Sequence, residues 1–135
     1  MRFRWVVPGI AMLALTIGCA GRGALGQRDG WALLGERQVS DRVDHDRIVV
    51  TGLRSDFTAI KLTVERASVD FRRVVVHFAN SGDQEVEMRN TIRAGGETRA
   101  IDLRGGDRVI SNVEFWYDAN TIRGRTATVR LFGRR

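Results

Sequence analysis

The chain has 135 residues, a formal net charge of +6 and a single cysteine. This length fits one domain with a modest core, and one cysteine excludes an internal disulfide framework or a cysteine-based zinc cluster. The basic residues are interleaved with acids along the chain, which disfavours a nucleic-acid-binding protein. We therefore expect no nucleic-acid partner and no cofactor.

Residues 1–18 have the layout of an export signal. A short basic region opens the chain, and the apolar run at 6–18 ends in a small residue. This run is shorter than the roughly 20 apolar residues that a membrane-spanning helix requires. A small-x-small motif at 24–26 offers a later cleavage site, in which case the signal extends to residue 26. Either cut predicts an exported protein.

Cys19 lies directly after the apolar run and begins a Gly-rich spacer, residues 19–30. In bacterial lipoproteins the thiol of a cysteine at this place carries a diacylglycerol, and two or more acyl chains give stable membrane attachment. We expect lipidation at Cys19 and a membrane-anchored lipoprotein that faces the periplasm or the cell surface. The alternative is plain cleavage, which would leave a soluble periplasmic or secreted protein.

From residue 31 to residue 135, apolar and polar residues alternate with the period of two that is typical of half-buried strands. The clearest runs are 60–65, 73–78, 85–89, 101–103, 112–117 and 127–132, and the shorter ones are 33–39, 47–51 and 67–71. Clusters of Gly, Asn and Asp separate these runs, as turns require. The pattern predicts one all-β domain, an antiparallel β-sandwich, jelly-roll-like, with eight to nine short strands.

Several short stretches carry a resemblance to a known family. They are IKLTV at 60–64, VHF at 76–78, IDLRGGDR at 101–108 and ATVRLFG at 127–133. In their order and strand pattern, over about residues 31–135, they resemble the YaaI-like family of small exported bacterial proteins, a domain of unknown function. The resemblance implies export and a β-rich domain, and it provides no catalytic residues.

Trp116 is the most suggestive candidate for ligand binding. If the apolar residues of the run 112–117 face the core, Trp116 faces outward together with Asn112, Glu114 and Asp118. An outward aromatic side chain with polar neighbours can stack on a sugar ring or hold a protein partner. The alternative is that another layer, such as the segment around Trp31, covers it.

Potential metal ligands gather in one predicted loop. Asp41, Asp44 and Asp46 surround His45 there, and carboxylate oxygens suit calcium. Their spacing matches no EF-hand loop, so a solvated turn is the alternative and we expect no metal. A zinc site requires three or four ligands, and the domain at 31–135 has two histidines and no cysteine. We therefore expect His45 and His77 to be surface histidines.

No catalytic constellation is visible, since no serine lies in a G-x-S-x-G motif. We expect a non-enzymatic cell-envelope protein that binds a polysaccharide, a lipid headgroup or a protein partner, or that is structural. The alternative is a hydrolase acting on envelope polysaccharide through paired carboxylates. Its candidate acids are Glu85, Glu87, Asp102, Glu114 and Asp118.

Overall fold

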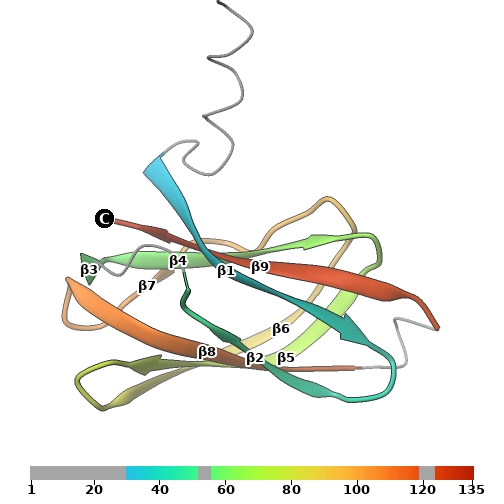
Figure 1. The fold of residues 1–135 in the computed structure, drawn as a ribbon, viewed down its shortest axis with the longest axis horizontal. Coiled ribbons are helices and arrows are strands. Elements are labelled where there is room, and N and C mark those ends of the chain that lie inside the picture. The colour runs from blue at the N-terminus through green and yellow to red at the C-terminus, as the bar shows by residue number, and fades with distance from the viewer. Residues whose placement is uncertain (1–29, 52–55, 119–123) are drawn as a thin grey trace, which may run out of the picture.

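The computed structural model describes residues 30–51, 56–118 and 124–135. The predicted signal, Cys19 and nearly all of the spacer lie outside these described residues. The described chain forms nine strands in two antiparallel sheets that pack face to face (Figure 1), so the prediction of an all-β sandwich is confirmed. No helix in this part of the chain is long and apolar enough to cross a membrane.

The strands follow one another with short connections. In chain order they are β1 (Trp31–Ser40), β2 (His45–Val49), β3 (Asp56–Phe57), β4 (Ala59–Glu65), β5 (Val69–Phe78), β6 (Asp83–Ile92), β7 (Ile101–Asp102), β8 (Arg108–Asp118) and β9 (Thr126–Arg134). One sheet has the order β1-β9-β4-β7 and the other β2-β8-β5-β6, with β3 paired to β8. With the two-residue β3 set aside, the order of the remaining eight strands, four in each sheet, is that of a jelly roll.

The apolar face of each strand fills the space between the sheets. On β8, Val113, Phe115 and Tyr117 are at most 2% exposed, as the alternation predicted. Phe71 of β5 meets Phe115 edge-on, with ring centroids 5.8 Å apart. Full burial of each such side chain stabilises the fold by roughly 1.5–3 kcal/mol, so the domain needs no disulfide to hold its core.

Two strand predictions were wrong. Residues 69–71 of the first run and the whole run 73–78 belong to one strand, β5, whose alternation is broken because the register against β8 shifts between Phe71 and Arg73. Arg72 is the extra residue of this bulge, so Arg72 and Arg73 are both exposed. The strand β3 was not predicted, because two residues are too few to show a period.

Two close contacts hold the sides of the sandwich together. On one side, the buried Gln84 of β6 donates to the Asp102 carbonyl at 2.9 Å and accepts from the Arg104 N–H at 2.8 Å. On the other side, β1 passes so close to β2 that a Cβ on Gly35 would lie 2.7 Å from the Val49 carbonyl oxygen. The first contact ties one sheet to the other, and the second requires glycine.

Candidate functional site

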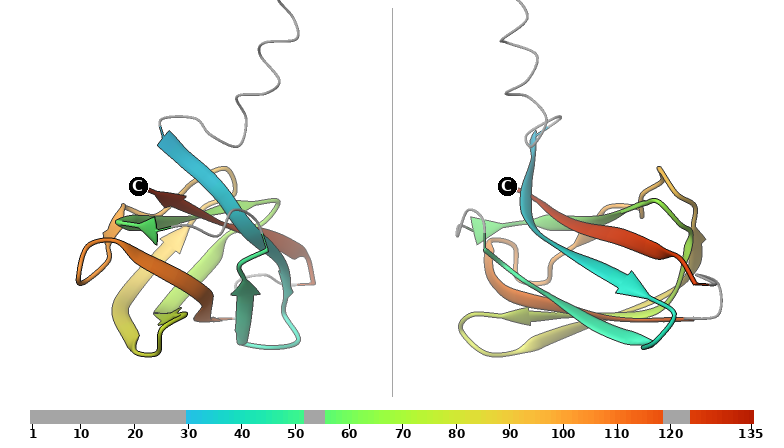
Figure 2. Two further views of the ribbon diagram at one scale, coloured as in Figure 1. Left: turned by 60° about the vertical axis from the view of Figure 1, so that its left-hand side comes forward. Right: turned by 45° about the vertical axis from the view of Figure 1, so that its right-hand side comes forward.

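Polar side chains cover the outer face of the sheet β2-β8-β5-β6. On β8, Asn112, Glu114 and Trp116 alternate with core residues and are partly exposed. They therefore point outward, as predicted. This sheet forms one outer layer of the molecule, and no described segment lies over its outer side (Figure 2).

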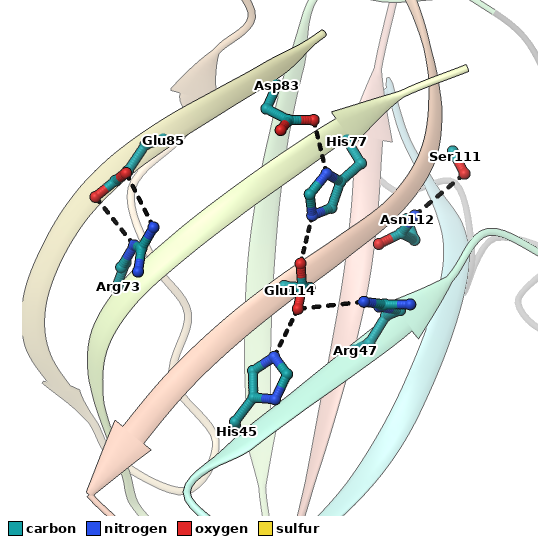
Figure 3. Close-up of polar contacts among 9 residues, drawn as sticks. All are labelled: His45, Arg47, Arg73, His77, Asp83, Glu85, Ser111, Asn112 and Glu114. Atoms are coloured by element: carbon teal, nitrogen blue, oxygen red, sulfur yellow. Dashed lines mark hydrogen bonds and ion pairs between the residues drawn. The ribbon is translucent and has the colours of Figure 1, made fainter. Parts of the chain in front are cut away.

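The Glu114 carboxylate of β8 joins side chains from β2 and β5, and one of these continues to β6 (Figure 3). Its Oε1 accepts from His77 Nε2 at 2.5 Å, and its Oε2 accepts from His45 Nε2 at 2.6 Å. Arg47 Nη2 lies 3.3 Å from the same Oε2. On the far side of the imidazole, His77 Nδ1 lies 2.7 Å from Asp83 Oδ1. We call these five residues the Glu114 network.

This network shifts the protonation of its members. Burial alone would raise the pKa of Glu114, but the hydrogen bonds from His77, His45 and Arg47 outweigh it and lower the pKa to about 2. Burial alone would lower the pKa of His77, but the hydrogen bonds and charges of Glu114 and Asp83 raise it instead. The network therefore favours an ionised Glu114 and a protonated His77.

Trp116 stands between two side chains of neighbouring strands. The His45 ring stacks on it, with centroids 4.6 Å apart and 27° between the planes. The Arg73 guanidinium lies over the ring, 4.5 Å from its centroid, and also pairs with Glu85 at 3.0 Å. Because β2 and β5 flank β8 on opposite sides, we place the indole between His45 and Arg73 and call the three residues the Trp116 stack.

The segment around Trp31, which was the alternative expected to cover Trp116, does not lie on this face. Trp31 lies in the other sheet, where Lys61 and Arg134 each approach its ring to 4.7 Å. Side chains of Trp116's own sheet, His45 and Arg73, cover the indole instead.

Asn112 and Asp118 flank this centre along β8. Asn112 Nδ2 donates to Ser111 Oγ at 3.2 Å, whereas its buried Oδ1 has no hydrogen-bond donor among the described residues. Asp118 Oδ2 accepts from Arg72 Nη2 at 3.2 Å. All four predicted ligand-binding residues thus share one strand, and their binding role stays a prediction.

Two of the three aspartates around His45 bond other segments of the chain. Asp41 Oδ2 accepts from the Gly124 N–H at 2.6 Å, and Asp46 Oδ1 accepts from Arg37 Nε at 2.7 Å. Across residues 30–51, 56–118 and 124–135, no group of three or more His, Cys, Asp or Glu side chains is placed to hold a metal ion.

The acids of the hydrolase alternative are spread over three strands. Glu85 and Glu87 lie on β6, Glu114 and Asp118 lie on β8, and β5 separates the two strands. Asp102 lies on β7, in the other sheet. The structure therefore does not bring these five acids together at one place.

A shallow hollow of about 670 Å³ lies on the outer face of the other sheet, with Leu33 and Phe132 among its lining residues. Arg130 crosses it and bonds both Glu36 and Glu65. One guanidinium thus pairs with both carboxylates, so neither of these two acids is without a partner.

Sequence reasoning missed most of the side chains that surround β8. His45, Arg47, Arg73, His77 and Asp83 come from β2, β5 and β6, and only the register of these strands brings them beside Glu114 and Trp116. The outward positions of Arg73 and His77 were readable from the alternation, but their neighbours were not.

Comparison with known proteins agrees with this fold. The family DUF2541, described as a domain of unknown function, matches residues 10–133. No curated protein matches the chain. A solved structure, described as the structural and functional characterization of Pseudomonas aeruginosa AlgX, is similar with a TM-score of 0.53 at 14% identity. The similarity covers 76% of this chain and 26% of the AlgX chain, and it supports the fold alone. Because the family match covers almost the whole sequence, the chain belongs to the DUF2541 family.

Proposed function

We propose that this protein is an exported, non-enzymatic envelope protein that binds a hydroxyl-rich polysaccharide on the outer face of β2-β8-β5-β6. The observation that carries the proposal is the Trp116 stack beside the Glu114 network, on a face that no described segment covers. Sugar hydroxyls both donate and accept hydrogen bonds, and this face places donors and acceptors close to one another.

The side chains of this face are held in place before any ligand arrives. His45 and Arg73 each bond a carboxylate while they flank Trp116, yet they remain 40% and 46% exposed. Binding groups that are already ordered lose less conformational entropy when a ligand binds. Because His45 and Arg73 flank the indole, a sugar would contact the rim of the Trp116 stack.

Asn112 adds a second reason to expect a polar ligand. Its buried Oδ1 lacks a donor among the described residues, and an unpaired buried acceptor costs about 1–3 kcal/mol. A small rotation of the amide toward a ligand hydroxyl would relieve that cost. The carboxamide therefore extends the binding face beyond Glu114.

The same geometry supports a binding role over a hydrolytic one. A general acid needs a pKa near the working pH, whereas the pKa of Glu114 lies at about 2. His77 has carboxylates at both ring nitrogens, so neither nitrogen is free to take a proton from a substrate. The side chains best placed for catalysis are thus occupied with one another.

Glycan binding by a Trp116→Ala variant tests the proposal. We measure sedimentation with purified peptidoglycan sacculi and affinity electrophoresis in neutral soluble polysaccharides. The wild-type protein should be retained by at least one of these glycans, and the variant should bind it about tenfold more weakly or worse. Phe132→Ala is the matched control, because Phe132 is a partly exposed aromatic on the outer face of the other sheet.

Retention of the wild type by none of these glycans, or equal losses in both variants, would refute the proposal. His45→Ala provides a second test if Trp116→Ala fails to fold, because it removes a half-exposed member of the stack and leaves the core untouched. It should weaken glycan binding in the same direction.

The export part of the proposal rests on residues 1–19 and on the YaaI-like pattern. Cell fractionation should find the protein in the membrane fraction, and Cys19→Ser should move it to the soluble periplasmic or secreted fraction. Mass measurement of the mature N-terminus checks the anchor directly. A free Gln27 at that terminus would show plain cleavage instead.

A further inference from the structure

A second surface of the domain carries exposed arginines that form no ion pair with a described residue. Residues 95–103 run antiparallel along β4 and form the edge of the sheet β1-β9-β4-β7. Gly95 N–H donates to the Val64 carbonyl at 2.7 Å, Thr98 N–H to Leu62 at 2.8 Å, and Leu103 N–H to Thr58 at 2.8 Å. This edge segment is therefore firmly held, although only β7 within it is a regular strand.

Four arginines line this edge, and we call Arg66, Arg93, Arg99 and Arg104 the arginine edge. All four are exposed, and none of their guanidinium groups bonds another described residue. On β2 and β5 of the opposite sheet, by contrast, carboxylates hold three arginines in ion pairs. Those pairs join Arg47 to Glu114, Arg72 to Asp70 and Asp118, and Arg73 to Glu85.

Carboxylates do not balance the arginine edge. Glu97 lies within it but pairs with Lys61 at 3.0 Å. Of the acids at 95–107, only Asp102 and Asp107 are exposed and without an ion pair to a described residue. Over residues 93–107, Arg93, Arg99 and Arg104 thus outnumber these two acids, and a protein surface with excess charge attracts ions of opposite sign.

Two of the arginines share one end of the edge. Val64 bonds both Gly95 and Gly96, so Arg66 and Arg93, two residues further along each segment, lie at the same end. Arg66 also has a φ of 79°, in the left-handed region that favours glycine. An arginine in this conformation beside a second arginine is poorly explained by stability, since like charges repel and the backbone is strained.

We propose that the arginine edge docks the domain on a membrane surface that carries anionic phospholipid headgroups. Guanidinium groups bind phosphate oxygens in a bidentate manner. Residues 96–103 pair along β4 from Val64 to Thr58, so the edge spans about 20 Å. That length suits contact with several headgroups in a plane, rather than the capture of one small ion.

Vesicle flotation of the full-length chain carrying Cys19→Ser tests this docking without an acyl anchor. The protein should float with vesicles of phosphatidylcholine containing phosphatidylglycerol, and much less with phosphatidylcholine alone. Each arginine near an anionic surface strengthens binding about fivefold. Arg93→Gln/Arg99→Gln/Arg104→Gln should therefore weaken binding to the anionic vesicles by about 100-fold.

The matched control is Arg42→Gln/Arg125→Gln/Arg135→Gln, which removes the same charge from exposed arginines outside the edge. It should change binding by about threefold or less, since screening limits distant charges. Equal losses in the two triple variants would show an effect of net charge alone and overturn the proposal. If the first triple variant fails to fold, Arg99→Glu alone should weaken binding at unchanged thermal stability.

Competition with soluble polygalacturonate tests whether the ligand of the arginine edge is a membrane or an anionic polysaccharide. Binding to this polymer with the same arginine dependence, but no flotation with anionic vesicles, would assign the edge to a polysaccharide and overturn the proposal. Flotation that excess polygalacturonate does not displace would support it.

Discussion

Glu114→Gln removes the charge that holds the outer face of β2-β8-β5-β6 together. The ordinary pKa of a glutamate is 4.5, and its fall to about 2 in the folded protein corresponds to about 3 kcal/mol of stability. Because the folded pKa is lowered, this stability is present above pH 4.5 and is lost as the pH falls toward 2. The side chain is only 13% exposed, so solvent screens the interaction little.

Urea unfolding followed by far-UV circular dichroism at pH 2 to pH 7 measures the effect. The free energy of unfolding of the wild type should exceed that of Glu114→Gln by about 3 kcal/mol near pH 6. The difference should shrink toward zero near pH 2. Glu87→Gln is the control, since Glu87 lies on the outer face of β6 with no ion pair to a described residue, and its difference should be small throughout. A Glu114 difference that does not change with pH would refute the electrostatic account of the network.

Three further changes probe the fold around the site. In urea unfolding, the wild-type free energy of unfolding should fall as the pH rises above 6.5, because the raised pKa of His77 gives stability that is lost as the pH rises through that pKa. His77→Gln should remove this fall. Gly35→Ala should destabilise the domain by about 1–3 kcal/mol in the same assay, because the new Cβ meets the Val49 carbonyl oxygen. Gln84→Leu should lower the free energy of unfolding by about 1–3 kcal/mol, because the Arg104 N–H loses its acceptor. Amide hydrogen exchange at Arg104 should become faster, and unchanged exchange would contradict this role.

The strand pattern of β8 shows how far the sequence alone could predict the face. Alternation correctly placed Trp116 and Glu114 outside and Phe115 inside, because side chains of a strand point to opposite faces in turn. The same rule failed on β5, where the bulge at Arg72 shifts the period by one residue. Val75 shows a second limit, since it points outward yet is only 6% exposed.

The partners of Glu114 could not be predicted from the alternation. His45 and Glu114 are 69 residues apart in the chain, and His77 and Glu114 are 37 apart. Only strand order and register place them side by side, and both follow from the packing of the whole sandwich. The two histidines were predicted only as surface residues, and the structure joins them through one carboxylate.

The position of β9 also bears on how the domain reaches its folded state. Strand β9 lies between β1 and β4, and contacts such as Arg130 to Glu36 join residues 94 positions apart. Chains dominated by such distant pairings fold slowly. The sheet β1-β9-β4-β7 cannot close until residues 126–134 have been synthesised. The sandwich is therefore completed only when the last described strand becomes available.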